Sequence, residues 1–120
     1  MGYKEDGKNE MLDALGALIT HASLHTGFPC TAINEITTGG ESPYTREAIT
    51  WSPADEGEME ASNQPEFDVP GSTTVAGVGF WTASSEGTIL ADADVDDEVF
   101  TNAGTYTLTS VTLDLNNDPA

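Results

Sequence analysis

The sequence has almost no basic residues. Three Lys and Arg residues, namely Lys4, Lys8 and Arg46, stand against 21 Asp and Glu, and the net charge is -18. Contacts with nucleic-acid phosphates need clusters of Lys and Arg, so direct nucleic-acid binding is excluded. In dilute buffer this many like charges on a 12.6 kDa chain oppose the compact state. At molar salt the Debye length falls to about 3 Å and the repulsion is largely screened. We therefore expect a protein adapted to high salt.

The distribution of the acids separates three explanations for them. A solvated tail, or a patch that mimics nucleic acid or collects calcium, would concentrate its charge in blocks. Here the acids run from Glu5 through Glu56 to Asp118 and are interleaved with strand-like stretches. A local binding patch would also not explain why lysine is nearly absent from the whole sequence. The pattern favours a whole-surface adaptation to a salt-accumulating cytoplasm.

Cysteine and long apolar runs are also scarce. Cys30 is the only cysteine, so no intrachain disulfide can form. No Cys/His/Asn set surrounds it in the sequence, which favours a buried thiol over a nucleophile. No apolar run approaches the roughly 18 residues of a membrane span, and the first six residues lack the apolar region of a secretion signal. We expect no membrane association and no standard export.

The sequence carries no catalytic signature. It has no Ser-His-Asp order, no P-loop and no Rossmann fingerprint, and no acid stands out from the acidic background as a general acid. Gly77 and Gly79 are interpreted as positions that permit close packing under Trp81 rather than as a phosphate cradle. We therefore predict that the protein is not an enzyme, with no catalytic residues and no cofactor.

Two sets of residues are candidates for metal sites. The acidic run Asp92, Asp94, Asp96, Asp97 and Glu98 has carboxylates at alternate positions, as calcium loops do. An EF-hand needs Gly at its sixth position and Glu at its twelfth, and Asp97 and Ala103 occupy those places. An irregular calcium site stays open beside the favoured interpretation, a solvated acidic loop.

The second set is His21, His25 and Cys30. The two histidines are four residues apart and share one side of the backbone. A structural zinc site wants four ligands in recognisable pairs, which this set does not supply. No metal site is predicted.

One helix is expected, over residues 9–19. Met11, Leu12, Leu15, Leu18 and Ile19 follow helical spacing along one face, and Asn9 is the expected N-cap. We expect this amphipathic helix to lie against a sheet.

The remainder reads as short strands separated by turns. Gly39, Gly40 and Pro43 mark a loop over residues 31–44. The last predicted strand carries Tyr106 and Leu108 on one parity and Val111 and Leu113 on the other, which implies a bulge near Ser110 or a strand that passes between two sheets. The predicted strands cover residues 21–26, 46–51, 58–62, 65–69, 73–81, 88–91 and 105–115. The fold class is mostly β, an antiparallel, jelly-roll-like β-sandwich with one short N-terminal helix, in a single domain over residues 1–120.

Three aromatic residues are the best candidates for contacts with other molecules. Phe80 and Trp81 are adjacent, so on a strand they face opposite sides. One of them is expected in the core and the other against the helix or a neighbouring subunit. Trp51 shares a face with Ile49.

The order of these segments resembles a known family, the small tailed-phage virion proteins known as phage tail fibre proteins. Their pattern runs from an amphipathic helix through a Leu-His-Thr strand and a Gly-Gly-x-Tyr-x-Arg-x-Ala-Ile-Thr-like strand. A phrase close to Val-Thr-His-Val-Gly-Phe-Trp and a closing Thr/Leu-rich strand follow. In this chain the helix residues are Leu12, Leu15 and Leu18. The other matching segments are 24–26, 44–50, 67–70 and 75–81.

The resemblance implies a non-enzymatic virion component that contacts other capsid or tail proteins and is present in many copies, as a homo-oligomer. It carries over no catalytic residue. The chain departs from the family pattern in its acidity, which suggests a tailed virus of a salt-loving, haloarchaeal host. Placement on the capsid, as a decoration or turret-like protein, stays open beside placement on the tail. A cellular β-sandwich module of a halophile that binds sugar or calcium is the alternative.

Overall fold

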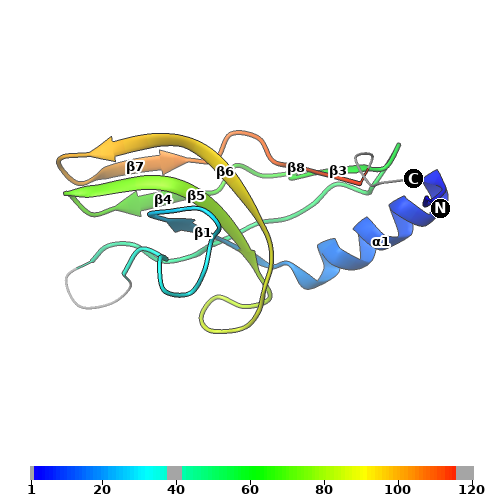
Figure 1. Ribbon diagram of the computed structural model, residues 1–120, viewed down its shortest axis with the longest axis horizontal. Helices are drawn as coiled ribbons and strands as arrows, with labels where there is room; N and C mark the ends of the chain where they lie inside the picture. The colour runs from blue at the N-terminus through cyan, green and yellow to red at the C-terminus, as the bar shows by residue number, and fades with distance from the viewer. Residues whose placement is uncertain (1, 38–41, 116–120) are drawn as a thin grey trace.

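The computed structural model describes residues 2–37 and 42–115. It confirms the predicted class: these residues are mostly β, every strand pairing among them is antiparallel, and the one helix that they contain, α1, precedes the strands. Figure 1 shows this order along the chain. The elements are α1 (Glu5–Leu18), β1 (His21–His25), β2 (Glu47–Ala48), β3 (Glu58–Glu60), β4 (Glu66–Val69), β5 (Thr73–Trp81), β6 (Ile89–Phe100), β7 (Gly104–Thr107) and β8 (Thr112–Asp114).

The strands form one four-stranded sheet and two pairs. The main sheet has the order β2-β1-β5-β6, while β4 pairs with β7 and β3 pairs with β8. The inner face of the main sheet packs against β4 and β7 and encloses the core. Its members include Phe80, Leu24, Val78 and Phe67.

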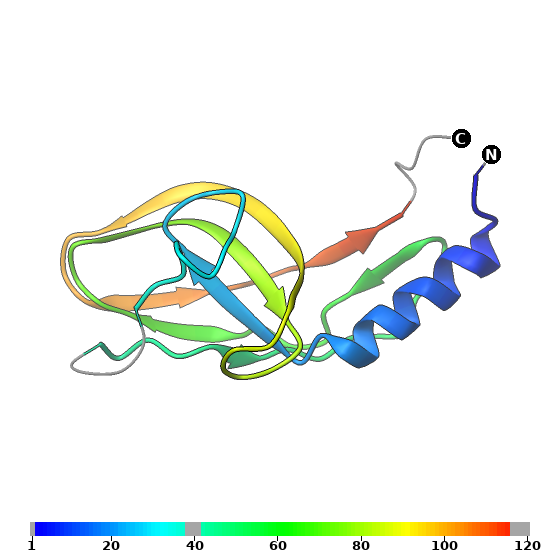
Figure 2. The same cartoon turned by 60° about the horizontal axis from the view of Figure 1, so that its bottom comes forward.

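The molecule is elongated, with extents of 47 × 23 × 22 Å. The sandwich occupies one end, and α1 lies beside the β3–β8 pair at the other (Figures 1 and 2). Leu12 and Met59, both fully buried, lie in α1 and β3, which are in contact.

The helix departs from its predicted form in two ways. It begins at Glu5 rather than after Asn9, with Glu5 and Asp6 placed favourably at the positive end of the helix dipole. The Asn9 side chain does not cap the helix, because its Oδ1 accepts a hydrogen bond from the Gly57 amide at 2.9 Å. The predicted apolar face is also wider than the surface the domain covers: Leu12 and Ile19 are buried, but Met11 and Leu18 are exposed.

The predicted strand over residues 46–51 is regular only in β2. Beyond these two residues the backbone hydrogen bonds go to other segments, which explains why the regular strand is shorter than predicted. Ile49 N donates to Thr20 O, and beyond it Ser52 N donates to Glu60 O. The segment thus leaves the main sheet and joins the chain next to β3.

The acidic run predicted as a loop is a strand, and this interpretation was wrong. β6 extends from Ile89 to Phe100, well beyond the predicted residues 88–91. Ala91, Ala93 and Val95 are partly buried against the core, while the Asp residues between them point outward. Carboxylates at alternate positions fit the two-residue repeat of a strand as well as the ligand spacing of a calcium loop.

The last predicted strand is divided. β7 pairs with β4 and β8 pairs with β3, so the chain passes from one pair to another between Thr107 and Thr112. Of the two alternatives, the passage between sheets describes this segment. Gly39 and Gly40 of the predicted loop lie outside the described residues.

Candidate functional site

The outer face of the main sheet carries a polar cluster under a loop formed by residues 26–36. Gly77 and Gly79 of β5 make room for it. A Cβ at Gly77 would lie 2.7 Å from Cys30 Sγ, and one at Gly79 would lie 2.7 Å from Ser23 Oγ and 2.8 Å from His25 Nε2. All three distances are too short for real contacts, so only glycine lets the loop and the β1 side chains lie this close to the sheet.

Ser23, His25 and Asn34 form a hydrogen-bonded chain within this cluster. Ser23 Oγ lies 2.6 Å from His25 Nε2, and His25 Nδ1 lies 2.8 Å from Asn34 Oδ1. The Trp81 indole N–H, which can only donate, bonds Ser23 Oγ at 2.6 Å. The Ser23 hydroxyl is then free to donate to Nε2, so His25 carries its proton on Nδ1 and donates to Asn34.

The orientation of Asn34 supports this assignment. Its Nδ2 donates to Pro29 O at 3.0 Å, and its Oδ1 accepts from Thr31 N at 2.8 Å. Burial lowers the pKa of His25, which agrees with a neutral imidazole. Asn34 therefore ties the 26–36 loop to the sheet through His25.

A serine, a histidine and an amide in this order resemble a hydrolase triad, but the burial of Ser23 rules out that role here. Ser23 and His25 have no exposed surface. The His25 ring is also stacked with Trp81, with the planes 7° apart. A nucleophile must reach its substrate, and Ser23 Oγ is enclosed and already bonded to the indole. The constellation therefore holds structure together.

Arg46 covers the cluster on the side facing away from the sheet. Its guanidinium lies 3.7 Å from the centre of the Trp81 ring. Its Nε and Nη2 donate to the two carboxylate oxygens of Glu35, each at 2.9 Å, and Nη1 donates to the carbonyls of Ala83 and Glu86. One side chain thus joins the 26–36 loop, the end of β5 and the turn that leads to β6. We call the set Ser23, His25, Asn34, Glu35, Tyr44, Arg46 and Trp81 the buried polar network.

Tyr44 links this network to β1. Its hydroxyl accepts from Leu24 N and donates to Glu35 Oε2, each at 2.9 Å. Burial raises the pKa of the phenol, so it stays protonated and keeps both bonds. Among the described residues, no buried side-chain nitrogen or oxygen lacks a hydrogen-bond partner.

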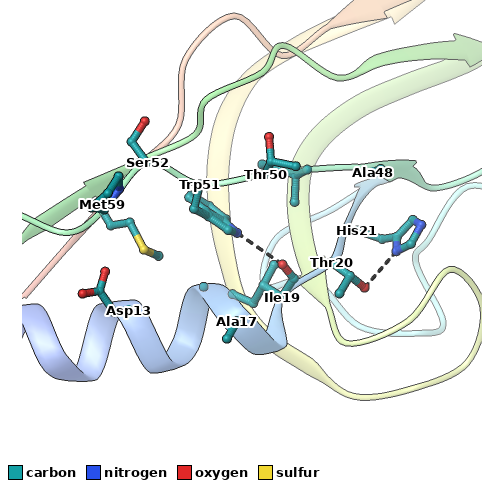
Figure 3. A pocket seen from close by; sticks show the side chains of 13 residues that line it. Asp13, Ala17, Ile19, Thr20, His21, Ala48, Thr50, Trp51, Ser52 and Met59 are labelled. Carbon is teal, nitrogen blue, oxygen red and sulfur yellow. Dashed lines mark hydrogen bonds between the residues drawn. The ribbon is translucent and has the colours of Figure 1, made fainter.

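A groove of about 770 Å³ lies between α1 and the segment that follows β2. Its walls include Gly16 and Ile19 on one side and Ile49 and Trp51 on the other. Figure 3 shows the Trp51 ring turned toward the end of the helix, where its Nε1 donates to Ile19 O at 3.2 Å. The groove is thus mainly apolar, and the indole N–H of Trp51 is already bonded to Ile19 O.

The predicted positions of the aromatic residues are partly confirmed. Phe80 and Trp81 face opposite sides, and Phe80 lies in the core, where Trp51 meets it edge-on. Trp81 was expected against the helix or a neighbouring subunit. It lies instead under Arg46 and beside His25, because the buried polar network covers that face.

The single thiol is buried, as predicted. Cys30 is covered by the sheet, and burial together with the nearby carboxylates of Asp92 and Asp94 raises its pKa to about 12. Its backbone N–H donates to Asp92 Oδ2 at 3.0 Å, so one carboxylate of the acidic run helps to fix the loop.

The three residues of the candidate zinc set have separate surroundings. His25 is in the buried polar network, Cys30 faces Gly77, and His21 Nδ1 bonds Thr20 Oγ1. Within residues 2–37 and 42–115, no three His, Cys, Asp or Glu side chains converge as metal ligands, the acidic run of β6 included. Nor does the described part of the chain contain a helix long and apolar enough to span a bilayer.

Sequence reasoning singled out His25 and Trp81 but missed that they belong to one network with residues far apart in the chain. Ser23, Asn34 and Glu35 are ordinary surface types, and only folding brings them to Trp81. Arg46 did have a signal, because it is the only arginine in a chain that has three basic residues.

Comparison with known proteins gives one family. No curated protein and no solved structure matches the chain. The family model described as Podophage GP4 fiber I protein gp80 matches residues 17–116, from the end of α1 through the last described strand. This covers the whole sandwich and the buried polar network, and the chain therefore belongs to this phage fibre family.

Proposed function

We propose that this protein is a non-enzymatic, multi-copy structural component of the surface of a tailed virus that works in high salt. The observation that carries the proposal is the fibre-family match over residues 17–116. Membership in a phage fibre family implies a virion component that contacts other virion proteins. Assembly would take place in the host cytoplasm.

The chemistry of the polar cluster supports a structural role. Its one nucleophile-base pair, Ser23 and His25, has no access to solvent. The enclosed ion pair between Arg46 and Glu35 joins loops to the sheet rather than facing a cavity. Such a network stabilises a small domain against the repulsion of its own surface.

The high-salt setting is supported by the location of the charges. The outward positions of β6 hold successive Asp residues, whereas Arg46 is enclosed in the fold. Surface repulsion is screened at molar salt, but the attraction of a desolvated pair is screened much less. A haloarchaeal host fits this balance.

The family name favours the tail, and capsid decoration is the other placement for a small domain of this kind. Quantitative mass spectrometry of purified particles, with the portal protein as the internal standard, gives the copy number. A cryo-EM map of the particle then gives the location. We expect many copies at the tail. Absence of the chain from purified virions would refute the proposal, and density on the capsid lattice would refute the tail placement.

A further inference from the structure

Helix α1 has a second apolar face that the domain leaves uncovered. Leu12 and Ile19 pack inward, but Met11 is 37% exposed and Leu18 is 56% exposed. Gly7 and Ala14, also exposed, lie on the same side of the helix. We call Gly7, Met11, Ala14 and Leu18 the outer stripe. It contains no charged residue, although the chain carries 21 acids.

The outer stripe has the spacing of a helix-helix seam. Its members are separated by four, three and four residues, as the a and d positions of a heptad are. Large and small residues alternate: Met11 and Leu18 occupy a positions, and Gly7 and Ala14 occupy d positions. Side chains as small as Gly and Ala allow another helix to approach closely.

We propose that the outer stripe binds the same stripe of a second copy, with the two α1 helices antiparallel. In an antiparallel seam each a residue packs against a d residue. Leu18 then lies over the partner's Gly7, and Met11 lies over the partner's Ala14. The two-fold axis repeats both contacts, so the interface is self-complementary and closes as a dimer. A parallel pair would stack Leu18 on Leu18 and Gly7 on Gly7, alternating overfilled and empty layers.

Charge also favours the antiparallel arrangement. Each chain carries -18, and the sandwich lies at one end of the molecule while α1 extends to the other (Figure 2). A parallel helix pair would set the two acidic sandwiches side by side. The antiparallel pair places them at opposite ends, and it aligns the helix dipoles favourably.

The size of the interface predicts weak association. Two exposed large side chains on each helix fall well short of the roughly 800 Å² per partner of a stable interface. We expect association near millimolar protein at molar salt and its loss at low salt. The match to the fibre family begins at residue 17, so most of α1 lies outside the matched region. The contact gives a physical basis for the proposed homo-oligomer. What the contact does in the virion rests on the proposed function, but the contact itself is a property of the purified chain.

Sedimentation equilibrium of the full chain in 2 M salt is the first test. We expect the average mass to rise from 12.6 kDa toward twice that value with concentration. Leu18→Glu and Met11→Glu should each weaken association more than tenfold while leaving the circular dichroism of the fold unchanged. Val99→Glu is the matched control: Val99 is 70% exposed and near the end of β6 that lies away from α1 (Figure 1). A monomer at all concentrations overturns the proposal.

Disulfide cross-linking tests the direction of the helices. A mixture of Met11→Cys and Ala14→Cys chains should form the mixed disulfide at least tenfold faster than either chain pairs with itself. Cys30 is buried and leaves the assay clean. Equal or faster self-pairing of Met11→Cys overturns the antiparallel arrangement. None of these outcomes depends on the place of the chain in the virion, so the proposed function fails or stands separately.

Discussion

Replacing Arg46 by methionine should be among the most destabilising single changes in this protein. The side chain is only 6% exposed and that of its partner Glu35 is 11% exposed. The change removes the bidentate pair with Glu35, two bonds to carbonyl oxygens and the contact with Trp81. It also leaves a carboxylate enclosed without its cation.

The expected loss follows from that last effect. Removing one partner of a buried ion pair costs about 3 to 5 kcal/mol, because the remaining charge stays desolvated. Domains of this size have roughly 5 to 15 kcal/mol of stability in total. Arg46→Lys keeps the charge but cannot form the forked pair, so we expect a loss of roughly 2 kcal/mol. The double variant with Glu35→Gln should be less destabilised than the sum of the single changes.

Urea unfolding in 2 M salt, followed by tryptophan fluorescence, measures these values. Lys4→Met is the matched control, since it makes the same change in net charge at an exposed position. We expect it to alter stability by less than about 0.5 kcal/mol. A loss below about 1 kcal/mol for Arg46→Met, or additive effects of Arg46→Met and Glu35→Gln, would refute the role assigned to the network.

Four further outcomes are expected. Dialysis to about 0.1 M salt, where charges interact over about 10 Å, should abolish the single cooperative melting transition, and unchanged melting would contradict the high-salt interpretation. Folding lowers the pKa of His25, so as the pH falls the unfolded state binds the proton before the folded state does. The free energy of unfolding should therefore decrease below about pH 6.5, by up to about 1.4 kcal/mol per pH unit. His25→Gln should remove this pH dependence in 2 M salt. Gly79→Ala should cost about 1 to 3 kcal/mol in urea unfolding, because its Cβ would meet Ser23 and His25. Gly7→Ala, with nothing within 4 Å of its Cβ, should instead stabilise the helix by up to about 1 kcal/mol at low protein concentration.

Local patterns determined much of the fold in advance. The alternation of apolar residues located β4, and the continuous apolar run located β5 with the bounds the structure has. Both strands are flanked by turn residues, so their ends are local properties. The split of the last strand was also readable, because Tyr106 and Val111 have opposite parity and cannot share one face.

The errors arose where a pattern had two physical solutions. Alternating aspartates suit a calcium loop and also the outer face of a strand, and the neighbours of β6 decided between them. Asn9 suits an N-cap, yet its amide bonds Gly57, which is 48 residues away. In each case a contact distant in sequence outweighed a local preference.

The sequence by itself determined the acidic surface, the antiparallel β class and the lack of a catalytic motif, because these depend on composition and on short-range periodicity. Only the tertiary structure decided that Arg46 is enclosed above Trp81 and that a serine, a histidine and an asparagine form a sealed chain. It also decided which half of the helix stays uncovered. Those features depend on which surfaces come into contact when the chain folds, and a residue's type and its neighbours in the sequence do not specify a partner far along the chain.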